Sequence, residues 1–160
     1  MKKILVAWFS ASGVTRAAAE TLAKAAEADL FEIRPETPYT DADLNWNDPK
    51  SRSTVEMKDR AFRPKIAPGD ARIADYDVVF LGFPIWWYVA PTIINTFLES
   101  YDFSGKRIIL FATSGGSGFG RTVDGLRPSV SSAASIEPGR ILNRSAGVDE
   151  LREWIKSLKL

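Results

Sequence analysis

The chain contains no cysteine and no histidine. The first absence excludes disulfides, thiolate metal sites and a cysteine nucleophile. The second removes the commonest general base, the Ser-His-Asp triad and most zinc sites. We therefore expect no catalytic side chain and no metal, and we expect any chemistry to come from a bound cofactor.

The sequence also lacks an excess of charge and a long apolar run. Its 21 basic and 20 acidic residues leave a net charge of +1, so a field that would attract nucleic acid is not expected. The apolar stretch at residues 4–9 is too short to span a membrane, and no secretory cleavage site follows it. These features predict a cytoplasmic protein without a nucleic-acid or membrane partner.

The 160 residues are enough for one domain, which we expect to span residues 1–160. Apolar runs at residues 4–9, 78–83 and 108–112 predict strands buried on both faces of a parallel sheet. A weaker strand is expected at residues 30–33. The last strand, within residues 135–142, contains Pro138 and Gly139, which places it at an edge of the sheet.

Helical spacing of apolar residues separates these runs. It covers residues 13–27, a segment that begins at Pro91, a short segment before Pro128, and residues 148–158. The alternation of strands and helices predicts right-handed βαβ units, and hence an α/β fold. Residues 35–75 break this rhythm, with five prolines and at most a turn or two of helix near residues 53–60. A connection of this length is typical of a functional loop or of an element that the sequence pattern does not reveal.

The first candidate site segment follows the first strand. It consists of Ser10, Ala11, Ser12, Gly13, Val14 and Thr15. Backbone N–H groups at a helix N-terminus suit a phosphate, and three hydroxyls could add hydrogen bonds, with Arg16 close by in sequence. The alternative is that Ser12 only caps the helix. The absence of a P-loop lysine and of a G-x-G-x-x-G motif disfavours nucleoside triphosphates and dinucleotides.

Two further segments follow the next two buried strands. The second consists of Pro84, Ile85, Trp86, Trp87 and Tyr88, whose aromatic rings cannot all enter a core and would offer a flat apolar wall. The third consists of Thr113, Ser114, Gly115, Gly116, Ser117 and Gly118, where glycine lets the backbone approach a ligand edge. One tryptophan is expected to pack in the core. The alternatives are core packing of all three aromatic residues in the second segment, and a flexible loop without a role in the third.

Ligands of open parallel sheets bind at the carboxyl ends of the strands, where all three segments are expected. A phosphate cradle, an aromatic wall and a glycine-rich edge together describe a phosphorylated planar heterocycle. FMN fits this description.

At these residues the chain resembles the flavodoxin family, in its short-chain flavodoxin-like branch. Ser10, Ser12, Gly13 and Thr15 match the family's T/S-x-T-G-N-T phosphate loop, and residues 82–87 and 113–118 are similar to the branch's other flavin loops. Residues 97–106 and 43–53 also fit. The resemblance implies a three-layer sandwich around a five-stranded parallel sheet in the order 2-1-3-4-5, with FMN at the switch point.

Three departures from the family pattern bear on function. Val14 replaces the usual Asn, so one bond to the phosphate is lost. Tyr88 replaces a Gly whose flexibility lets the neighbouring peptide flip on flavin reduction. The chain also lacks the strong acidity with which such carriers attract basic partners.

The function expected from this resemblance is electron transfer by bound FMN, with redox partner proteins or a small electron acceptor as partners. The alternative is an NAD(P)H-dependent FMN oxidoreductase of the quinone reductase type, with its second pocket formed by residues 35–75. A flavin-binding regulatory module is a third interpretation.

Overall fold

The computed structural model describes residues 2–143 and 146–160. Strands and helices alternate along most of the chain, as expected from the apolar runs. In order they are β1 (Ile4–Trp8), α1 (Val14–Ala26), β2 (Asp29–Glu32), α2 (Arg52–Lys58), the 3-10 helix η1 (Ile73–Asp75), β3 (Val78–Pro84), α3 (Thr92–Glu99), β4 (Arg107–Thr113), α4 (Thr122–Leu126), the 3-10 helix η2 (Arg127–Ser129), β5 (Ser135–Ile141) and α5 (Val148–Ser157).

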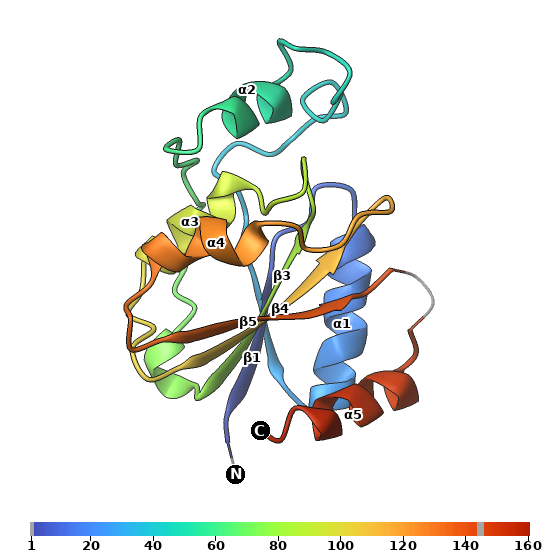
Figure 1. Cartoon of the computed structure of the whole chain (residues 1–160), viewed down its shortest axis with the longest axis vertical. Helices are drawn as coiled ribbons and strands as arrows, with labels where there is room; N and C mark the ends of the chain where they lie inside the picture. Colours follow the sequence, from blue (N-terminus) through green and yellow to red (C-terminus); the bar gives the residue numbers. More distant parts are fainter. Residues whose placement is uncertain (1, 144–145) are drawn as a thin grey trace.

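The five strands form one parallel sheet in the order β2-β1-β3-β4-β5, which confirms the predicted fold class and strand order. Figure 1 shows α1 and α5 on one face and α3 and α4 on the other. Successive residues of β3 alternate between the two cores: Val78 and Phe80 pack toward α1 and α5, and Val79 and Leu81 pack toward α3. Burial on both faces explains why this strand is a continuous apolar run.

The predicted edge position of the last strand is confirmed. Pro138 pairs with Leu110 and Arg140 pairs with Phe111, so Gly139 is the extra residue of a bulge. A Cβ at Gly139 would lie 2.1 Å from the Leu110 carbonyl oxygen, so only glycine fits there.

The expected helix beginning at Pro91 is shifted by one residue. Pro91 is the N-cap of α3, with φ −59° and ψ 147°, and Thr92 is the first helical residue. Proline fixes only φ, so the extended ψ at this position is compatible with a cap just outside the helix.

The connection between β2 and β3 holds more structure than its sequence indicates. It contains α2 and η1, and Pro35 and Ile66 form an isolated antiparallel bridge near its two ends. Figure 1 shows α2 beyond the carboxyl edge of the sheet, on the same side as the loops that follow β1 and β3. The connection is therefore placed next to the predicted site.

Gly82 in β3 gives a direct test of the packing between the strands. A Cβ at Gly82 would lie 2.1 Å from Cζ of Phe111, which is fully buried. We expect Gly82→Ala to lower the free energy of unfolding by about 1–3 kcal/mol, measured by urea denaturation. The matched control is Gly69→Ala, whose Cβ would meet Phe31 at an ordinary 3.7 Å. Equal stabilities of the two variants would contradict the packing.

Candidate cofactor site

The three loops predicted to form the site meet at one edge of the sheet. The strands that precede them, β1, β3 and β4, are parallel neighbours and end at the same level (Figure 1). The N–H of Ile85 donates to the Thr113 carbonyl at 2.8 Å, and the hydroxyls of Thr15 and Thr113 lie 2.7 Å apart. Thr113 of the third loop is thus hydrogen-bonded both to Ile85 of the second loop and to Thr15 of the first.

The loop after β1 ends in a helix N-terminus that is open to an anion. Gly13 is the N-cap of α1 in the left-handed region, with φ +96°, and no side chain of the described residues caps the helix. The expected alternative, in which Ser12 is the cap, is therefore wrong. Ser10 accepts the Gly13 N–H at 2.9 Å, and the first turn contains no acidic residue. The remaining N–H groups of this turn suit a phosphate.

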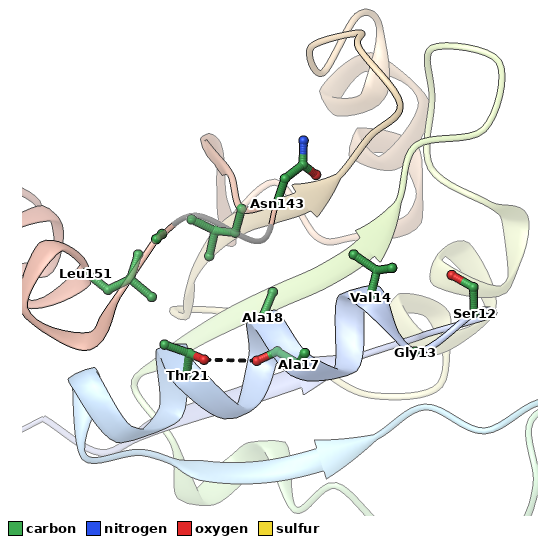
Figure 2. Close-up of a pocket in the computed structure, with 10 residues that line it drawn as sticks. Ser12, Gly13, Val14, Ala17, Ala18, Thr21, Asn143 and Leu151 are labelled. Atoms are coloured by element: carbon green, nitrogen blue, oxygen red, sulfur yellow. Dashed lines mark hydrogen bonds between the residues drawn. The ribbon is translucent and has the colours of Figure 1, made fainter.

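Two residues of the first loop are placed differently from their neighbours. Thr15 is 1% exposed, and its hydroxyl is hydrogen-bonded to Thr113. Val14 lines a cavity of about 360 Å³ on the flank of α1, where Figure 2 shows it near Ala18, with Asn143 and Leu151 on the other side of the cavity. This cavity shares Ser12, Gly13 and Val14 with the first loop, but its described lining contains no residue of the other two loops.

The loop after β3 is a tight turn built from bulky residues. Trp86 and Val89 exchange two backbone hydrogen bonds of 2.9 and 3.1 Å, and the two residues between them have positive φ, 49° for Trp87 and 67° for Tyr88. Such conformations cost about 1–3 kcal/mol each and cluster at functional sites. Trp87 is 44% exposed and Tyr88 67%, whereas Trp86 packs against Phe9. This confirms the prediction that the three rings do not all enter the core.

The aromatic turn is tied to the glycine-rich loop. The Tyr88 carbonyl accepts the N–H of Arg121 at 3.3 Å. Gly120 has φ +54°, and a Cβ there would lie 2.4 Å from the same carbonyl oxygen. The strained turn is therefore supported by a backbone that only glycine lets approach so closely.

The loop after β4 depends on Asn143, which sequence reasoning missed. The Asn143 side chain accepts the N–H of Ser114 at 3.0 Å and donates to its carbonyl at 3.1 Å. The Ser114 hydroxyl in turn accepts the N–H groups of Gly116 and Ser117. These two N–H groups are bonded within the loop, which is an ordered turn rather than a flexible glycine tract.

A second cavity, of about 410 Å³, lies between two of the loops and the β2–β3 connection. Its lining residues are Ala11, Ser12, Leu44, Trp46, Ser53, Pro84, Ile85, Trp86 and Trp87. None of them is charged, and residues 113–118 do not take part. Leu44, Trp46 and Ser53 were not among the predicted site residues, although they lie within residues 35–75, the connection expected to be a functional loop. The size is within the usual range for small-molecule pockets, roughly 300–1,000 Å³.

Residues 2–143 and 146–160 show no sign of a membrane-spanning segment or of a metal site. No helix in this part of the chain combines the length and apolar character needed to cross a membrane. The same residues contain no group of three or more acidic side chains placed to hold a metal ion.

Several known proteins are similar to this chain in sequence and in fold. A family model described as flavodoxin matches residues 3–158. Candidate flavoproteins of known structure from Bacteroides eggerthii DSM 20697 and Bacteroides uniformis ATCC 8492 are 46% and 45% identical, with TM-scores of 0.93 and 0.88. The first alignment covers 100% of this chain and 99% of the other, and the second 97% and 98%.

A more distant likeness is to a flavoprotein from Lactobacillus acidophilus NCFM in complex with FMN. It is 21% identical with a TM-score of 0.72, over 97% of this chain and 99% of the other, and it supports the fold. No curated protein matches the sequence.

The role of Asn143 can be tested by substitution. We expect Asn143→Ala to speed hydrogen exchange at the Ser114 and Ser117 amides and to lower the free energy of unfolding by about 1 kcal/mol, because two hydrogen bonds are lost at an exposed position. Asn143→Asp keeps the acceptor but loses the donor, so its effect on exchange should be intermediate. Exchange rates unchanged in both variants would show that Asn143 does not order the loop.

Proposed function

Because the chain belongs to the flavodoxin family, we propose that it binds FMN at the carboxyl edge of its sheet and transfers electrons between redox partners of the cytosol. The observation that carries the proposal is the open N-terminus of α1 beside an uncharged, aromatic-lined cavity. One feature suits a phosphate and the other a planar ring, and FMN combines both. FMN is also the ligand of the Lactobacillus acidophilus structure.

The phosphate end of the site relies on backbone groups. The first turn of α1 offers N–H groups with partial positive charge, and the hydroxyls of Ser12 and Thr15 are nearby. Because two hydroxyls can share one bond in either direction, Thr113 can donate to Thr15 and leave the Thr15 proton for the phosphate. Arg16 is directed to Glu20 at 3.9 Å on the exposed side of the helix.

The ring end of the site orients a flat ligand and excludes water. Trp86, Trp87 and Tyr88 supply apolar surface, and the backbone of residues 113–118 can face the polar edge of the ring. When bound, FMN supplies one- and two-electron transfer. The residues that the structure describes as lining the two cavities include no charged side chain.

We favour electron transfer over NAD(P)H oxidation because the residues described as lining the two cavities include no cationic side chain that could bind the phosphates of a dinucleotide. A dinucleotide carries a pyrophosphate that needs cationic or N–H partners, and the open N-terminus of α1 is assigned to the phosphate of FMN. The alternative, an oxidoreductase with a second substrate, is favoured by one feature, the cavity beside the aromatic turn to which the β2–β3 connection contributes.

The phosphate assignment can be tested at Ser12, which is exposed beside the open helix end. We expect Ser12→Asp to weaken FMN binding roughly ten- to hundredfold, because a carboxylate would repel the phosphate. Riboflavin, which has no phosphate, should bind nearly as tightly as to the wild type. Ser12→Asn is the matched uncharged control. Equal weakening of FMN and riboflavin in a titration of the apoprotein would remove the phosphate from this loop.

The proposed role can be separated from the enzymatic alternative by kinetics. The purified flavin-loaded protein should accept electrons from a chemical reductant and pass them to a one-electron acceptor protein such as cytochrome c. It should oxidise NADH and NADPH no faster than free FMN does, with or without a quinone. Saturable oxidation of either nucleotide, well above the rate with free FMN, would establish the oxidoreductase instead.

A further inference from the structure

The segment that carries Trp46 is held at its base by a buried carboxylate. Glu56 of α2 is 6% exposed, accepts a hydrogen bond from the Tyr39 hydroxyl and pairs with Arg52 at 2.8 Å. Arg52 also donates to the Thr37 carbonyl at 2.7 Å, and its guanidinium lies 3.8 Å from the centre of the Tyr39 ring. A buried carboxylate is tolerated when its oxygens are satisfied in this way.

The same tyrosine joins this cluster to the sheet. The Tyr39 ring packs edge-on against Phe9 and Trp86, each with ring centres 5.6 Å apart. Burial and the bond to Glu56 raise the pKa of Tyr39 well above its usual value, so the hydroxyl remains a donor. Phe9 follows β1 and Trp86 belongs to the aromatic turn, so the base of the connection contacts two neighbouring strand ends.

Residues 40–51 form a closed series of turns between the two halves of this cluster. Thr40 and Asp43 cap each other's N–H groups, and the Ser53 N–H donates to the Asp43 carbonyl at 2.9 Å. Further along, the Asp48 N–H donates to the Asn45 carbonyl at 3.0 Å. Trp46 lies within these turns, so its position depends on the Tyr39–Arg52–Glu56 cluster.

Trp46 lines the second cavity, and most of its surface is exposed to solvent. It is 69% exposed, and Trp87, another lining residue of the same cavity, is 44% exposed. The cavity shares Ala11 and Ser12 with the loop at the α1 N-terminus. A ligand whose phosphate binds that helix end and whose ring lies on the aromatic turn therefore reaches the cavity that Trp46 and Trp87 both line.

We propose that Trp46 stacks on the flavin ring as the wall opposite the aromatic turn, and that the Tyr39–Arg52–Glu56 cluster is the positioning group that holds it there. This inference rests on the proposed FMN binding. It adds a wall from the β2–β3 connection to the loops that follow β1, β3 and β4. It also gives the buried carboxylate of Glu56 a role, because its bonds to Tyr39 and Arg52 join the two ends of the turns that carry Trp46.

The test titrates apoprotein with FMN and with riboflavin. Trp46→Ala should weaken both ligands by the same factor, roughly tenfold to a hundredfold, because both contain the ring. Trp46→Phe should restore most of the affinity. The emission of the remaining tryptophans in Trp46→Phe should be quenched less by FMN than wild-type emission, because one stacked indole is gone. The matched control is Val55→Ala, an exposed apolar residue of α2 outside the cavity.

The positioning role has its own readout. Tyr39→Phe keeps the ring but deletes its bond to Glu56, and we expect it to weaken riboflavin binding severalfold. In the Trp46→Ala background the same change should have no effect, whereas a merely structural role would give the same loss in both backgrounds.

The outcomes separate this inference from the proposed function. Failure of the wild type to bind either flavin would overturn the proposed function. Wild-type binding that Trp46→Ala weakens no more than Val55→Ala would overturn the inference alone. Unchanged flavin affinity combined with altered reoxidation by a quinone would place Trp46 beside the electron acceptor, and this result would also overturn the inference.

Discussion

The site depends on the parallel pairing of β3 between β1 and β4. Gly82 lies opposite Trp8 on one side and Phe111 on the other, and its missing side chain leaves room for the Phe111 ring. Because the three strands are in close register, their carboxyl ends finish at one level. The hydrogen bond from Ile85 to Thr113 extends the contact beyond the strands. A bulkier residue at Gly82 would disturb the pairing of the three strands that carry these loops.

At the carboxyl ends of these strands, the described part of the site consists mainly of backbone groups and uncharged side chains. The open end of α1 offers N–H groups, and Gly13 allows the chain to enter the helix with no capping side chain among the described residues. The aromatic turn carries two residues with positive φ, and the strain is held by two backbone hydrogen bonds and by the approach of Gly120. In the proposed function, such a site would recognise its ligand through the shape of the ring and through the phosphate, and the bound cofactor would supply the reactivity.

The β2–β3 connection shows how a long loop can be ordered with one short helix. Its order comes from a carboxylate, a guanidinium and a phenol that satisfy one another, Glu56, Arg52 and Tyr39. The phenol ring packs on Phe9 and Trp86, so the connection and the aromatic turn share one contact. In the proposed function, a change in this cluster would reach the flavin ring through Trp46 and Trp86.

The sequence by itself determined the α/β class, the order of the elements, the edge position of the strand with Pro138 and Gly139, and the three loops at the carboxyl edge. These features follow from the spacing of apolar residues and from the positions of proline and glycine, which act on their neighbours along the chain. Only the tertiary structure decided that Asn143 orders the Ser114 loop, that Thr15 meets Thr113, and that Trp46 lines a cavity with Trp87. Thr15 and Thr113 are 98 residues apart, and such contacts are set by how the packed elements meet, which no local pattern records.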